Sequence, residues 1–165
     1  MAIILNYELR PGEIEEVLTD ADEYPVADLN SIAFWQGILR VDISFIVDGV
    51  DLSLSYGHLV QFTIYATSAM MEIEQGATRS LYYDSESGYC LEFMRDNDNV
   101  VVSRCDYGQN RSAVSTVADL SSAFSAFAKR VYDDLCNELP GLSENEWFED
   151  AFSRISRKEL PPPNI

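Results

Sequence analysis

The sequence predicts an α+β fold, in which an antiparallel sheet of about five strands carries two or three helices on one face. Three features of the 165-residue chain support this class. A β-hairpin signal lies in the first third, strand-like segments joined by short turns follow it, and two amphipathic helical segments come last. Strands that pair with one another and are then followed by helices are typical of α+β domains.

The N-terminal part combines an expected strand with an acidic segment. Residues 2–9 alternate loosely between apolar and polar side chains, and Pro11-Gly12 ends that pattern. Within residues 13–31, only the part from Ile14 to Leu18 fits a short helical turn, and the rest is expected to be loop. The segment holds seven acids: Glu13, Glu15, Glu16, Asp20, Asp22, Glu23 and Asp28.

The strongest local signal is the hairpin around Asp48-Gly49, a favoured two-residue turn flanked by residues 40–47 and 50–55. Pairing across the turn places six apolar residues on one face: Val47 opposite Val50, Phe45 opposite Leu52, and Ile43 opposite Leu54. The residues on the other face are mostly polar, which is typical of an antiparallel sheet with one buried and one solvated face.

Residues 58–75 fit two patterns. Val60, Phe62, Ile64 and Ala66 alternate as in a strand. The helical alternative has one apolar face made of Leu59, Phe62, Ala66, Ala69, Met70 and Ile73. We predict a helix, because such a length is unusual for a strand, with Gly76 as its C-terminal stop.

Residues 79–107 have the pattern of a β-meander. Strands are expected at 79–84, 89–95 and 100–107, joined by turns at 85–88 and 96–99. The second turn, Asp96-Asn97-Asp98-Asn99, lacks the later glycine and glutamate of a calcium-binding loop. Residues 111–115 are expected to be a linker.

Two helices are expected to close a single domain spanning residues 1–160, with a proline-rich tail at 161–165. Thr116 and Asp119 have the spacing of a helix N-terminal capping box, and Ser143 and Glu146 repeat it. The first helix should end at Leu139-Pro140-Gly141. Its apolar face contains Val117, Leu120, Phe124, Phe127, Val131 and Leu135.

The charge is the most unusual property of the chain. It has 28 Asp and Glu against 11 Lys and Arg, a formal net charge of −17. This balance argues against binding to nucleic acid, which needs clustered basic side chains, and against anionic membrane surfaces. Simple solubility would explain the charge, and so would electrostatic steering of a cationic partner. No signal peptide or membrane-spanning stretch is seen, so a cytoplasmic location is expected.

The sequence contains no catalytic motif, and we expect neither enzymatic activity nor a cofactor or metal. His58 is the only histidine, and a surface or capping role is expected for it. Cys90 and Cys105 become cross-strand neighbours if the turn is centred on Asn97-Asp98. A thiol pair for redox or metal chemistry is then conceivable, but the simpler interpretation is that they pack as small apolar residues. With Cys136 they make three thiols, which we expect to be reduced.

In size, acidity, mixed α+β order and lack of catalytic residues, the chain resembles small cytoplasmic bacterial immunity proteins, which neutralise toxins that are often nucleases. The resemblance implies a basic protein partner whose active or substrate-binding surface is masked. An adaptor subunit and an unrecognised enzyme using surface carboxylates are the alternatives. The candidate contact residues are Glu13, Glu15, Glu16, Asp20, Asp22, Glu23, Tyr24, Asp28 and Trp35.

Overall fold

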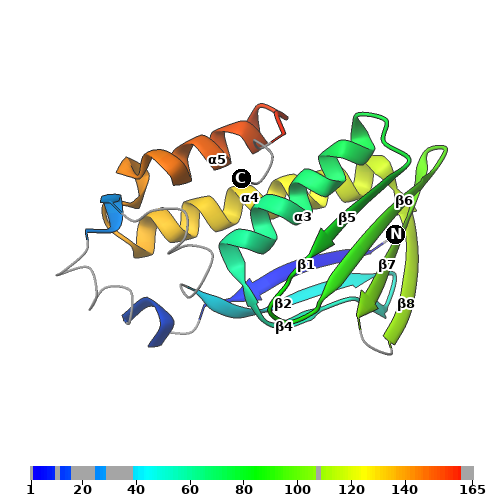
Figure 1. Ribbon diagram of the computed structural model, residues 1–165, viewed down its shortest axis with the longest axis horizontal. Helices are drawn as coiled ribbons and strands as arrows, with labels where there is room; N and C mark the ends of the chain where they lie inside the picture. Colours follow the sequence, from blue (N-terminus) through cyan, green and yellow to red (C-terminus); the bar gives the residue numbers. More distant parts are fainter. Residues whose placement is uncertain (1, 10–11, 16–24, 29–38, 107–108, 161–165) are drawn as a thin grey trace.

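The computed structural model describes residues 2–9, 12–15, 25–28, 39–106 and 109–160, and confirms the α+β class (Figure 1). Within these residues, eight strands form two four-stranded antiparallel sheets, where a single sheet of about five strands was expected. The elements are β1 (Ile3–Glu8), η1 (Val26–Asp28), β2 (Arg40–Val47), β3 (Val50–Asp51), β4 (Leu54–His58), α3 (Leu59–Glu74), β5 (Arg79–Tyr83), β6 (Cys90–Asp96), β7 (Asn99–Asp106), β8 (Gln109–Thr116), α4 (Val117–Glu138), η2 (Leu142–Glu144) and α5 (Glu146–Ser156).

The first sheet is built on β2, which pairs with β1 on one side and with β3 and β4 on the other. The expected hairpin register is confirmed, because Val47 pairs with Val50 and Ile43 pairs with Leu54. The returning strand is interrupted at Leu52 and Ser53. The Ser53 hydroxyl oxygen accepts a hydrogen bond from the Phe45 N–H at 3.0 Å, so a side chain replaces the backbone partner there.

The second sheet is a meander in the order β5-β6-β7-β8. The expected turn at 96–99 is present, and it is centred on Asn97-Asp98, since Asp96 pairs with Asn99. The expected linker at 111–115 was wrong, because these residues belong to β8. The segment lacks a strong strand pattern, since the residues it buries against the core are the small Ala113 and Ser115. Pairing with β7 over its whole length holds it in the sheet.

The helix α3 confirms the helical interpretation of residues 58–75. It lies between the two sheets and α4, and contacts β5, β6, β2 and β4. Because of these neighbours, twelve of its residues are buried, including Thr63, Thr67 and Ser68. A helix covered on most sides has no clear polar face, which explains why its sequence also fits a strand.

The helix α4 begins as expected, with the Thr116 hydroxyl accepting a hydrogen bond from the Asp119 N–H at 3.0 Å. The expected start of the last helix at Ser143 was wrong. Residues 142–144 form the 3-10 turn η2, and the cap of α5 is Asn145, whose side-chain oxygen accepts from the Phe148 N–H at 2.9 Å. The Asn145 amide also donates to the carbonyl oxygens of Val26 and Ala27 in η1.

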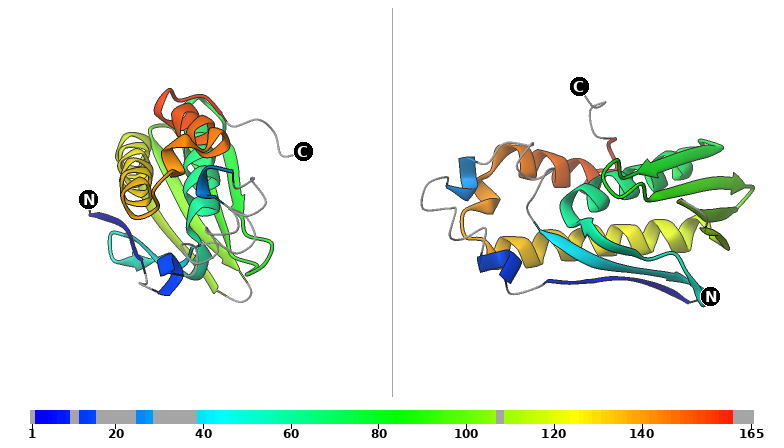
Figure 2. Two further views of the ribbon diagram at one scale, coloured as in Figure 1. Left: turned by 90° about the vertical axis from the view of Figure 1, so that its left-hand side faces the viewer. Right: turned by 60° about the horizontal axis from the view of Figure 1, so that its bottom comes forward.

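The helices α3 and α4 lie side by side over the sheets, and α5 packs on the side of this pair that faces away from β1 and β2 (Figures 1 and 2). The core is one continuous apolar cluster that includes residues of both sheets and all three of these helices. Among the described residues, no helix is long and apolar enough to cross a membrane.

Candidate functional site

The face of the β5–β8 sheet that points away from α3 carries exposed apolar side chains. Along β5, Ser80 and Tyr82 are buried while Leu81 and Tyr83 are 51% and 53% exposed. On β6 and β8, Met94 is 40% exposed and Val114 is 53% exposed. An antiparallel sheet with one solvated face normally places polar residues there. The outer face of this sheet instead mixes these apolar side chains with polar ones, namely Arg79, Glu92, Ser103 and Ser112.

The strand register brings these side chains together. Met94 pairs with Val101, and Val101 pairs with Val114, so the three form a row across β6, β7 and β8. Leu81 and Tyr83 lie on the same face of the adjacent β5. We call these five residues the outer apolar face. Contiguous exposed apolar side chains on a folded protein commonly mark a contact surface for another molecule.

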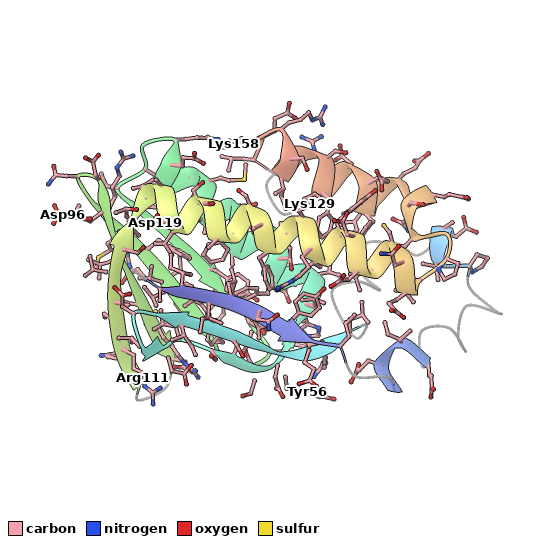
Figure 3. All side chains as sticks on the ribbon, turned by 180° about the vertical axis from the view of Figure 1, so that it is seen from behind. Tyr56, Asp96, Arg111, Asp119, Lys129 and Lys158 are labelled. Carbon is pink, nitrogen blue, oxygen red and sulfur yellow. The ribbon has the colours of Figure 1, made fainter. Side chains whose placement is uncertain are left out.

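Three carboxylates border the outer apolar face at the β6–β7 turn, and we call them the acidic rim. Asp96 follows Met94 by two residues on the same side of β6, Asp98 is in the turn, and Asp119 is in the first turn of α4. The Val117 N–H donates to the Asp98 carbonyl oxygen at 2.9 Å, which holds the turn against the helix start. Figure 3 shows Asp96 and Asp119 at the same end of the molecule.

Within the described residues the acidic rim forms no ion pair, although the Arg95 guanidinium lies at the same β6–β7 turn. Within the described part of the chain, eight Lys and Arg side chains pair with carboxylates, none of which belongs to the rim. Arg95 donates to the backbone carbonyls of Asn97, in the β6–β7 turn, and of Ile73, and Arg130 donates to that of Leu5. The centre of the outer apolar face is neutral, because Arg79 and Glu92 form an ion pair at 2.5 Å there.

Three of the candidate contact residues from the acidic segment are described by the structure. Glu13 is half-buried, and its Oε2 accepts a hydrogen bond from the Arg40 N–H at 3.3 Å. Glu15 and Asp28 are exposed. The others lie outside the described residues: Glu16, Asp20, Asp22, Glu23, Tyr24 and Trp35.

The structure places Asp28 at a second acidic surface, at the opposite end of the molecule from the β6–β7 turn (Figure 1). The Asn145 amide donates to the Val26 and Ala27 carbonyl oxygens at 3.1 and 3.2 Å, which fixes η1 against the start of α5. The exposed acids Glu138, Glu144 and Glu146 lie at the adjoining ends of α4, η2 and α5. We call these three residues the helix-end acids.

A groove of about 870 Å³ runs between α4 and α5. Tyr132 lines it and donates a hydrogen bond from its hydroxyl to Glu149, an interaction that raises the tyrosine pKa above its ordinary value. The charges that line the groove are balanced, with three acidic and three basic residues: Asp133, Glu149, Asp150, Lys129, Arg157 and Lys158. The groove therefore does not favour a basic ligand over an acidic one.

His58 does not lie on the surface, which corrects the role expected from the sequence. It is 2% exposed, and its Nε2 lies 3.1 Å from Oε2 of Glu86. The same carboxylate oxygen accepts from Nη2 of Arg40 at 2.7 Å. His58 also does not cap α3 with its side chain. His58 is the last residue of β4 and directly precedes α3.

The outer apolar face was not found by sequence reasoning, although a signal for it was present. Val100, Val101 and Val102 form an apolar run in a strand, so successive side chains point to opposite faces of the sheet and each face receives at least one of them. The described residues contain no group of three or more side chains placed to hold a metal ion. No family model, no curated protein and no solved structure matches this chain.

Proposed function

We propose that this protein is a non-enzymatic binding protein whose partner is a basic protein, and that the contact is made by the outer apolar face and the acidic rim. The observation that carries the proposal is an open sheet face with Leu81, Tyr83, Met94 and Val114 exposed, next to carboxylates that form no ion pair within the described residues.

The two parts of this surface would contribute differently. Burying the apolar side chains supplies affinity, and Tyr83 is the kind of residue that dominates protein interfaces. The carboxylates of the rim, together with the net charge of −17, would accelerate association with a cationic protein. Rim charges act mainly on the association rate, whereas buried anchors act mainly on dissociation.

The partner class we favour is a nuclease-type bacterial toxin, which makes this chain a cytoplasmic immunity protein. A nuclease binds the phosphate groups of its nucleic-acid substrate through a basic surface. An acidic protein that covers such a surface competes with nucleic acid for it. An adaptor subunit would use the same apolar face, but its partners would form a large assembly and would not lose an activity on binding.

The experiment compares two variants of equal charge. The protein is immobilised, the partner is captured from the source cells at low salt, and association and dissociation rates are measured with the purified partner. The rim variant Asp96→Asn/Asp98→Asn/Asp119→Asn and the control Glu138→Gln/Glu144→Gln/Glu146→Gln each remove three carboxylates, at opposite ends of the molecule. We expect slower association for the rim variant and a smaller effect for the control.

Three results would contradict the proposal. The first is an acidic partner, the second is association that does not depend on salt, and the third is an equal loss for both variants. If the partner is a nuclease, addition of one equivalent of this protein should abolish its activity. If the partner is basic but its activity is not inhibited, the binding function stands and the immunity role is rejected.

A further inference from the structure

Cys90 and Cys105 face each other across β6 and β7. The pairing of the strands aligns Leu91 with Arg104, and one step further along the same register aligns the two cysteines. Their Sγ atoms are 2.6 Å apart, much closer than two sulfur atoms that only pack against each other. Both cysteines are free thiols in the structure. Adjacent strands thus hold two thiols at a separation from which a bond can form with little backbone movement.

The two thiols differ in access to solvent. Cys105 is exposed, whereas Cys90 is 7% exposed. Both lie on the outer side of the sheet, in the row that runs from Tyr83 to Asn110. A small reagent can therefore reach Cys105 directly, and Cys90 is then within reach of the modified sulfur.

We propose that Cys90 and Cys105 are a reversible dithiol–disulfide pair, oxidised by thiol–disulfide exchange with a low-molecular-weight disulfide. The Cys105 thiolate attacks one sulfur of the reagent, which forms a mixed disulfide and releases one reagent thiolate. The Cys90 thiolate then attacks Sγ of Cys105, forms the internal disulfide and releases the second reagent thiolate. The two protein protons pass to the two released thiolates, so the reagent is reduced by two electrons and the cysteine pair is oxidised by two.

The second step should be the slower one near neutral pH. In the reduced pair, burial, followed by the hydrogen bond with Cys105, raises the pKa of the Cys90 thiol to about 12, and burial still acts once Cys105 carries the reagent. Only the thiolate is the nucleophile, so ring closure should accelerate as the pH rises above neutrality. A mixed disulfide on Cys105 should therefore be seen transiently, and it should decay faster at higher pH.

The local charge predicts a preference among disulfide reagents. The negative charges of Glu92 and Asp106 contribute to the raised pKa of Cys90, so both carboxylates act at the pair. The whole protein carries a net charge of −17. Cationic cystamine should therefore react faster than neutral hydroxyethyl disulfide, and anionic glutathione disulfide should be slowest. We expect about a tenfold or larger difference between cystamine and glutathione disulfide at low salt, and a smaller one at high salt.

The test uses the full-length protein with Cys136→Ser, together with the same background carrying Cys90→Ser or Cys105→Ser. Each reduced protein is treated with cystamine, unfolded, alkylated and analysed by mass. The Cys136→Ser protein should lose both alkylation sites, have a mass lower by two hydrogen atoms, and give a Cys90–Cys105 linked peptide. Dithiothreitol should restore both thiols. The Cys90→Ser control should stop at the mixed disulfide on Cys105.

Two outcomes would overturn the proposal. One is a stable mixed disulfide on Cys105 without ring closure at any pH at which the protein stays folded. The other is an intermolecular disulfide as the main product. Circular dichroism before oxidation shows that each variant is folded, so a failure to close cannot be assigned to unfolding. No binding partner takes part in this measurement, so its result is independent of the proposed binding function.

Discussion

Phe45 of β2 and Phe124 of α4 meet edge to face, with ring centroids 5.5 Å apart and ring planes at 71°. Phe124 makes the same kind of contact with Phe93 of β6, at 5.8 Å and 73°. One helical side chain therefore touches aromatic residues from both sheets. The sheets also meet directly, where the Tyr89 hydroxyl donates to the Leu52 carbonyl oxygen and β8 contacts β2 and β3, and α3 and α4 join them further.

Replacement of Phe124 by alanine should strongly destabilise the protein. The ring is 1% exposed and its removal leaves a cavity between the two sheets. We expect a loss of about 3–5 kcal/mol in the free energy of unfolding, measured by urea denaturation. The control Leu81→Ala, on the outer apolar face, should change stability by no more than about 0.5 kcal/mol. A small loss for Phe124→Ala would contradict the packing described above.

Asn145 should act through both ends of its amide. Asn145→Ala removes the cap of α5, which costs about 1 kcal/mol. It also leaves the carbonyl groups of Val26 and Ala27 without their donor, and a further loss of about 1–3 kcal/mol follows if they stay buried. Asn145→Asp keeps the capping oxygen but loses the donor, so it separates the two contributions. Hydrogen exchange at residues 26–28 should increase in both variants, and unchanged exchange would show that η1 is held by other contacts.

The proposed contact predicts a kinetic difference between an anchor and the rim. Tyr83→Ala should accelerate dissociation of the basic partner and leave association nearly unchanged, because a buried aromatic side chain acts after docking. The rim variant should have the opposite pattern. Surface plasmon resonance at two salt concentrations measures both rates. If Tyr83→Ala binds and dissociates like the wild type, the outer apolar face is not the contact.

Acid should weaken the Arg104–Asp106 pair at the junction of the sheets. The Arg104 Nε donates to Oδ1 of Asp106 at 2.9 Å, and the same guanidinium donates to the Ser53 carbonyl of the first sheet. The hydrogen bonds from Arg104 hold the pKa of the Asp106 carboxyl below the ordinary value of 3.8. A carboxylate with a lowered pKa in the folded state stabilises the fold above its unfolded pKa. That contribution is lost as the pH falls through the folded value.

The matching measurement compares the wild type with Asp106→Asn. At about pH 6 the variant should be less stable in urea, and the difference should shrink as the pH is lowered toward about pH 3. A difference that does not depend on pH would mean that the carboxylate acts by packing and not by its charge.

Sequence patterns located the elements whose local signals are strong. Asp48-Gly49 determined the register of the first hairpin, and Thr116 with Asp119 determined the start of α4. These signals are local, because a turn type or a cap depends on a few neighbouring residues. The acidic segment was recognised by composition alone, and its contact role stays a prediction.

The other features of the fold and of the site depend on contacts between residues that are far apart in the sequence. The strand β8 is held by pairing with β7, and its own residues are mostly polar, so neither periodicity nor propensity indicates it. The capping residue Asn145 also donates hydrogen bonds to the carbonyl groups of Val26 and Ala27, which lie more than a hundred residues earlier in the chain. Likewise, the outer apolar face exists only when three strands bring Met94, Val101 and Val114 into one row.

The sequence by itself determined the α+β class, the net charge and the local turns and caps, since these follow from composition and short-range contacts. Only the tertiary structure decided that the strands divide into two sheets, that His58 is buried beside Glu86, and that Cys90 and Cys105 touch. The physical reason is that burial and side-chain contact are set by packing between elements far apart in the chain. Among the residues that the structure describes, the rim acids form no ion pair, and eight of the basic side chains pair with carboxylates elsewhere.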